Sequence, residues 1–93
     1  MKEKESDIQR TIKDYLQWMG WYVWKNHQSA LSHKGVSDLT AIKNGIVLWI
    51  EIKTENGKQS KNQKLFEREI KEHAGHYFIA RKWEDVSEYI AAL

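Results

Sequence analysis

The sequence predicts an α/β fold in which helices flank a mixed β-sheet, and three observations support this prediction. First, Ile8, Ile12 and Leu16 recur at helical spacing, which indicates an amphipathic helix near the start. Second, two runs rich in β-branched and apolar residues flank Asn44-Gly45, the dipeptide most typical of a tight hairpin turn. Third, a helical pattern separates this hairpin from a further strand-like run, so that connection is a crossover between parallel strands.

The predicted order is helix, three strands, helix, strand and helix within a single domain of residues 1–93. Ser6 with Gln9 three residues later resembles a capping box, so Glu5 is expected to lie just before the first helix. The expected elements are a helix at 6–19, a strand at 21–24, a loop at 25–34, the hairpin, a helix at 60–74, a strand at 77–80 and a last helix lined by Trp83, Val86, Ile90 and Leu93.

The two-residue turn fixes the register of the hairpin. Lys43 faces Ile46, and counting outward places Asp38 directly opposite Glu51. Opposed residues have Cβ atoms roughly 4.5–5.5 Å apart, so two carboxylates at these positions should repel each other unless a cation lies between them. Lys53 is two residues beyond Glu51 and projects from the same face of the strand.

Two carboxylates and an ammonium on one sheet face indicate a metal-dependent phosphodiesterase site. Oxygen ligands suit Mg²⁺, which is usually held by one or two carboxylates together with substrate phosphate. The metal would polarise the phosphate, and the lysine could orient a water or stabilise developing negative charge. The alternative is a half-exposed hairpin that happens to carry an ordinary Glu51 and Lys53 near its open end.

The order Ser37-Asp38, hairpin and Glu51-Ile52-Lys53 resembles the PD-(D/E)xK nuclease superfamily, with Ser37 in place of the proline. Over nearly the whole chain the sequence is similar to the VRR-Nuc domain family in its standalone bacterial or phage form. The matching segments, in order, are Glu5-Ser6-Asp7-Ile8-Gln9, Lys34-Gly35-Val36-Ser37-Asp38, Glu51-Ile52-Lys53-Thr54-Glu55-Asn56-Gly57-Lys58, Ser60-Lys61-Asn62-Gln63 and His73-Ala74-Gly75-His76-Tyr77.

This resemblance implies a restriction-endonuclease-like fold, Mg²⁺ or Mn²⁺ as cofactor, and cleavage of branched DNA in the manner of Holliday junction resolvases. It also implies a set of site residues. These are the metal ligands Asp38, Glu51 and the Ile52 carbonyl, the catalytic lysine Lys53, the active-site helper Gln63 and the helix-borne acid Glu5.

Two of these assignments have alternatives. Gln63 occupies the third position of a capping box with Ser60, so structural capping alone could explain it. Glu5 precedes the expected helix start, and the neighbouring acids Glu3 and Asp7 are substitutes for it.

Charge distribution is more informative than the net charge of +2. Residues 25–64 hold seven lysines and three acidic residues, two of which are the expected metal ligands. This concentration favours phosphate binding, although a solvated lysine-rich surface is the simpler reading. The chain has no cysteine, which excludes thiolate metal sites, and no apolar run long enough to span a bilayer. We expect a cytoplasmic protein of a bacterium or a phage-infected host cell, with no membrane partner.

Aromatic residues point to a partner surface. Trp18, Trp21 and Trp24 cluster near the first helix–strand junction and are expected in the core or a subunit interface. A resolvase-like protein must cut two strands, so we expect a homodimer with two identical sites. His27 and His33 precede the hairpin and either contact DNA or are polar loop residues. The alternative function is a nucleic-acid-binding module with little or no cleavage, and a restriction-type enzyme is a third candidate that lacks room for a recognition domain.

Overall fold

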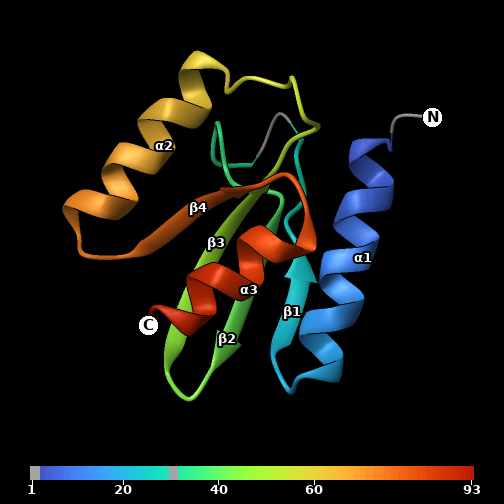
Figure 1. Cartoon of the computed structure of the whole chain (residues 1–93). Coiled ribbons are helices and arrows are strands. Elements are labelled where there is room, and N and C mark those ends of the chain that lie inside the picture. The colour runs from blue at the N-terminus through green and yellow to red at the C-terminus, as the bar shows by residue number, and fades with distance from the viewer. Residues whose placement is uncertain (1–2, 30–31) are drawn as a thin grey trace.

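The helices and strands follow one another in the predicted order α-β-β-β-α-β-α (Figure 1). The computed structural model describes residues 3–29 and 32–93. No helix in these ranges is long and apolar enough to cross a membrane. The elements are α1 (Glu5–Trp18), β1 (Tyr22–Lys25), β2 (Leu39–Lys43), β3 (Ile46–Ile52), α2 (Lys61–Glu72), β4 (His76–Ala80) and α3 (Trp83–Ala91).

The four strands form one mixed sheet with the order β1-β2-β3-β4. The β1–β2 and β2–β3 pairs are antiparallel, whereas β3 and β4 are parallel, as the crossover through α2 predicts. In the hairpin Lys43 pairs with Ile46 and Leu39 pairs with Ile50. This register is the predicted one, and continuing it by one pair brings Asp38 opposite Glu51.

Helices cover both faces of the sheet. On one face Ile12 of α1 and Val86 of α3 join Leu48 and Ile50 of β3 in a single buried core. Side chains of a strand alternate between faces, so Trp49, between Leu48 and Ile50, points to the opposite face of the sheet. There its ring packs edge-on against Phe66 of α2, with 5.5 Å between the ring centroids. The central strand β3 is therefore enclosed from both sides.

The start of α1 differs from the prediction. The helix begins at Glu5, and its N-cap is Lys4, which makes no capping hydrogen bond with its side chain. Ser6 lies inside the first turn, so the expected capping box of Ser6 and Gln9 is wrong. The Lys4 carbonyl already accepts the N–H of Ile8, so the N-cap lies two residues before Ser6.

The loop that precedes β2 packs tightly against the start of α2. Gly35 has a φ of +75°, and a Cβ built on it would lie 2.1 Å from the Asn62 carbonyl oxygen. Only a glycine permits so close an approach of two backbones. The contact places the first turn of α2, including Gln63, beside the loop that leads to Asp38.

We predict that Gly35→Ala is more destabilising than Gly45→Ala. Both glycines have positive φ, +75° and +81°, but a Cβ at Gly45 meets nothing within 4 Å. Gly45→Ala should therefore cost about 1–2 kcal/mol in backbone strain alone. Gly35→Ala should add roughly 1–3 kcal/mol of overpacking against α2. Urea unfolding of the two variants measures this difference, and equal losses would contradict the proposed role of the loop–helix contact.

Candidate active site

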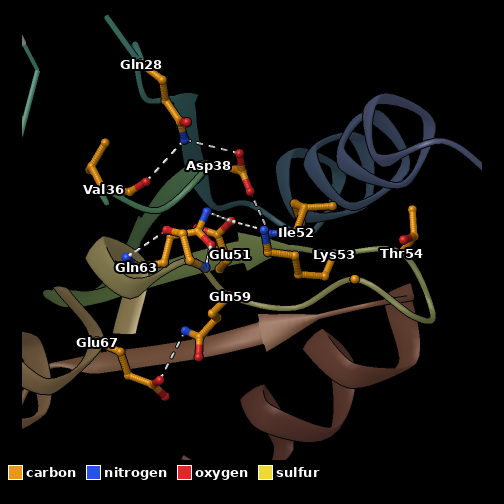
Figure 2. A network of polar contacts seen from close by, with 12 residues as sticks. Gln28, Val36, Asp38, Glu51, Ile52, Lys53, Thr54, Gln59, Gln63 and Glu67 are labelled. Carbon is orange, nitrogen blue, oxygen red and sulfur yellow. Dashed lines mark hydrogen bonds and ion pairs between the residues drawn. The ribbon is translucent and has the colours of Figure 1, made fainter. Parts of the chain in front are cut away.

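Glu51 is a buried carboxylate at the end of β3, with 1% of its surface exposed. Its Oε2 atom accepts a hydrogen bond from Gln63 Nε2 at 2.9 Å and lies 3.7 Å from Lys53 Nζ (Figure 2). Its Oε1 atom is buried and has no hydrogen-bond partner among the described residues. A buried acceptor without a donor is costly, so one oxygen of Glu51 is open to a further partner.

Asp38 is held by donors from two segments (Figure 2). Its Oδ2 atom accepts the backbone N–H of Ile52 at 2.7 Å, which ties it to the end of β3. Its Oδ1 atom accepts a hydrogen bond from Gln28 Nε2 at 3.3 Å, and the same nitrogen donates to the Val36 carbonyl at 3.1 Å. Both carboxylate oxygens are thus oriented before any ligand binds.

The surroundings of Glu51 strongly favour its neutral form. The pKa of Glu51 is raised to about 9: burial is the largest cause, the nearby charge of Asp38 adds to it, and Lys53 opposes it. Two charged carboxylates at directly opposed positions repel each other. A proton on Glu51 therefore relieves the same repulsion that a cation between the two groups would relieve.

Gln63 both caps α2 and contacts Glu51, while its role as an active-site helper stays a prediction. Its side-chain Oε1 accepts the Ser60 N–H at 2.8 Å, and its own N–H donates to Ser60 Oγ at 3.2 Å, which completes the capping box. Because the cap engages the amide oxygen, the amide nitrogen is left to face Glu51 Oε2. The cap of α2 thereby orients a donor toward Glu51.

The acidic residues near the start of the chain, Glu3, Glu5 and Asp7, differ in their surroundings. Glu5 is exposed at the first residue of the helix, and its charge is the weakest of the influences that raise the pKa of Glu51. Asp7 forms an ion pair with Arg10 at 3.2 Å, and Glu3 is exposed. Within residues 3–29 and 32–93, no group of three or more acidic or histidine side chains is arranged to hold a metal. The carboxylates that meet here are Asp38 and Glu51.

These two carboxylates fit a hard divalent cation. Both offer oxygen atoms, the type of ligand that Mg²⁺ and Mn²⁺ prefer, and Oε1 of Glu51 lacks any other partner in the described chain. Magnesium sites commonly use only one or two protein carboxylates and complete the shell with water and phosphate. The N–H of Ile52 is engaged by Asp38, and its carbonyl stays a predicted ligand.

Sequence reasoning missed a set of supporting residues. Gln28 lies in an irregular loop, where no periodicity reveals a contact with Asp38 ten residues away. Below Glu51, Gln59 Nε2 donates to Glu67 Oε1 at 3.1 Å and contacts the Tyr77 hydroxyl at 3.0 Å. Burial raises the pKa of the Tyr77 phenol, which keeps this hydroxyl neutral. The spacing of these supporting residues in the sequence matches no motif.

The histidines and tryptophans take mixed positions. The His33 ring packs edge-on against Phe66 at 5.3 Å between centroids, whereas His27 is exposed. Trp21 is buried in the core, one of the two locations expected for these tryptophans. Trp18, in contrast, is 86% exposed. Trp24 is partly buried and donates to Asn26 Oδ1 at 3.2 Å.

We predict that metal-free protein loses stability as the pH rises from 5 to 9. Folding raises the pKa of Glu51 from its ordinary 4.5 to about 9, so the folded state binds a proton in this window that the unfolded state has released. Unfolding free energy should therefore fall as the pH rises. Glu51→Gln, which does not titrate, should flatten the curve. Thermal unfolding in EDTA checks this, and parallel curves for the two proteins would contradict it.

Comparison with known proteins identifies the family and the fold of the chain. The model of the family described as "Archaeal holliday junction resolvase (hjc)" matches residues 1–86. A solved structure described as a "VRR_NUC domain" superposes with a TM-score of 0.80 at 22% identity, over 94% of this chain and 94% of that chain. No curated protein matches the chain. The structural match confirms the predicted fold class, and the family match confirms the resemblance to PD-(D/E)xK nucleases. The chain therefore belongs to the archaeal Holliday junction resolvase family, whose members are nucleases of the PD-(D/E)xK fold.

Proposed function

We propose that the protein is a divalent-metal-dependent DNA endonuclease, formed by residues 1–93 as one domain, that hydrolyses phosphodiester bonds in branched DNA. One observation carries the proposal. Glu51 is buried opposite Asp38 with one oxygen lacking a partner in the described chain, while Lys53 and Gln63 contact its other oxygen. A buried acid in this state suits cation binding better than a structural role, because a structural role would leave Oε1 unsatisfied.

Asp38, Glu51 and the Ile52 carbonyl are the groups that would hold Mg²⁺ or Mn²⁺. When bound, such a cation polarises a phosphate and lowers the pKa of a coordinated water. The Ile52 N–H holds Asp38 in place through a 2.7 Å hydrogen bond, so the aspartate needs no rearrangement to bind. Gln63 restricts the rotation of Glu51 through its amide nitrogen.

Lys53 supplies positive charge at the reacting phosphate. Its side chain is only 12% exposed, and its Nζ lies 3.7 Å from Glu51 Oε2. An ammonium in a site that excludes water stabilises developing negative charge more strongly than one at the surface. Glu5 is proposed as a more distant acid of the same site, since its charge acts on Glu51 from the start of α1.

Exposed lysines precede Asp38 and follow Lys53 in the sequence, and they can bind a polyanionic substrate. Lys34 lies in the loop before Asp38, and Lys58, Lys61 and Lys64 lie between Lys53 and the first turn of α2. All four side chains are exposed, so each can contact a phosphate without a desolvation penalty. DNA is the substrate that we propose, and the cytoplasm of a bacterial or phage-infected cell is the expected compartment.

An exposed aromatic surface supports the proposed homodimer. Tyr15, Trp18, Met19 and Tyr22 are 47%, 86%, 38% and 70% exposed, and Tyr22 begins the edge strand β1. Tyr15, Trp18 and Met19 follow one another at the end of α1, whereas Tyr22 lies beside Trp24 on the sheet face opposite the buried Val23. Exposed aromatic residues are enriched at interfaces. Lys43, next to the hairpin turn, donates to the Met19 carbonyl, so this aromatic surface adjoins the turn, at the opposite end of the hairpin from Asp38 and Glu51. Pairing through it would leave both sites open.

Cleavage of a DNA panel tests the chemistry. We predict that Mg²⁺ or Mn²⁺ supports cutting of flap, splayed or four-way substrates and that EDTA abolishes it. Glu51→Gln and Lys53→Ala should each lower the rate by roughly 10²-fold or more. Lys53→Ala should retain metal binding better, because it keeps both carboxylates. Wild-type cleavage by Glu51→Gln would refute the site, and DNA binding without any cutting would favour the binding-module alternative.

Assembly and substrate preference form a separate prediction. The protein should sediment as a dimer at micromolar concentration and bind a four-way junction more tightly than a linear duplex of the same sequence. Salt should weaken both complexes but preserve the preference, because phosphate neutralisation is common to both substrates. Trp18→Ser should shift the protein toward monomer. Leu65→Ser, at a 38% exposed position on α2, is the control that should not. A wild-type monomer would refute the proposed dimer.

A further inference from the structure

Arg81 binds backbone carbonyls of the turn that follows Lys53. Its Nη1 atom contacts the carbonyl oxygens of Thr54 at 2.6 Å, Gly57 at 2.8 Å and Glu55 at 3.2 Å. One guanidinium nitrogen carries two N–H groups, so two short bonds and one shared contact account for the three carbonyls. The turn is closed by the Gly57 N–H, which donates to the Thr54 carbonyl at 3.0 Å.

The same turn packs against the side chain of Lys53. A Cβ built on Gly57 would lie 3.4 Å from both Cβ and Cδ of Lys53, so the backbone at this position is close to the aliphatic part of the lysine. The backbone N–H of Lys53 is fixed separately by the Ala80 carbonyl at 3.1 Å. These two contacts hold the backbone and the first part of the side chain of Lys53.

Arg81 is itself anchored. Its backbone N–H donates to Asp85 Oδ2 at 2.8 Å, in the first turn of α3. It directly follows β4, which pairs in parallel with β3, the strand that leads into Lys53. A continuous set of contacts therefore runs from α3 through Arg81 and the 54–57 turn to the lysine. Figure 2 shows Lys53 and Thr54, where the turn begins.

We propose that Arg81 is a positioning residue that sets the place of the Lys53 ammonium through the 54–57 turn. The inference rests on the proposed function, because it assumes that Lys53 acts on the reacting phosphate. Arg81 touches neither carboxylate and is therefore assigned no direct role in the reaction. Its loss should act on the rate of the bound complex and not on the affinity for metal or DNA.

Single-turnover cleavage with saturating Mn²⁺ and junction DNA tests this inference. Arg81→Met keeps the aliphatic part and removes the donors, and it should lower the rate by roughly tenfold or more, since small displacements of a reacting group are costly. Arg81→Lys, whose ammonium can also donate to carbonyls, should restore much of the rate. Lys82→Met is the matched control. It removes an adjacent positive charge that makes no hydrogen bond or ion pair with the described residues, and it should leave the rate unchanged.

A double-mutant cycle separates positioning from general stability. In a Lys53→Ala background, Arg81→Met should have almost no further effect on the residual rate, because the group it positions is gone. Deuterium exchange supplies a readout independent of activity, in which Arg81→Met, but not Lys82→Met, should speed exchange of the Gly57 amide. If Arg81→Met fails to fold, Asp85→Ala, which releases the Arg81 backbone, should give the same pattern in weaker form.

Several results would overturn the inference. Additive losses in the cycle, a wild-type rate for Arg81→Met, or unchanged exchange at Gly57 would each show that Arg81 does not act through the lysine. A wild-type rate for Lys53→Ala would refute the proposed function of Lys53 and the inference with it. A large loss for Lys53→Ala together with none for Arg81→Met would refute the inference alone.

Discussion

Two carboxyl groups face each other across the open end of the β2–β3 hairpin, and the rest of the site is arranged around their repulsion. The register of the hairpin brings Asp38 opposite Glu51, and the two groups cannot both be charged there without a counter-charge. The Ile52 N–H and Lys53 each satisfy part of the negative charge. Oε1 of Glu51 is the part that the described residues leave unsatisfied.

Burial makes this unsatisfied charge more consequential. Helices on both faces enclose β3, so Glu51 is almost completely removed from water. The low-dielectric surroundings raise the pKa of Glu51 and would equally strengthen its attraction to a bound cation. The chain thus gives up some stability at a site where a cation can recover it, as is common where function requires local strain. The contact of Gly35 with Asn62 supports the same site, because it brings Gln63 within reach of Glu51.

Sequence alone predicted the parts of the site that depend on local rules. The Asn44-Gly45 turn fixed the pairing, and strand alternation placed Lys53 beside Glu51, so both followed from counting. Contacts between distant irregular segments could not be predicted in this way. Gln28 reaches Asp38 from a loop, and Arg81 reaches back 24 residues to Gly57, neither at a spacing that any periodic element imposes.

Capping patterns in the sequence predicted one helix start correctly and another wrongly. The pattern Ser60 to Gln63 correctly predicted the start of α2, but the similar pattern from Ser6 to Gln9 did not mark the start of α1. In α2 the cap is reinforced by a tertiary contact, because the Gln63 amide also binds Glu51. In α1 backbone bonds to the Lys4 carbonyl are sufficient. The same local pattern therefore had two outcomes, and the one that formed a cap is joined by a tertiary contact.

We propose that Asp38 and Glu51 form a preformed site for one divalent cation. Anomalous diffraction from crystals grown with Mn²⁺ and without DNA tests it most directly. We expect a manganese peak between the two carboxylates, about 2.0–2.3 Å from an oxygen of each, with Glu51 Oε1 among the ligands. A fully occupied manganese ion elsewhere on the chain, with none between Asp38 and Glu51, would contradict it.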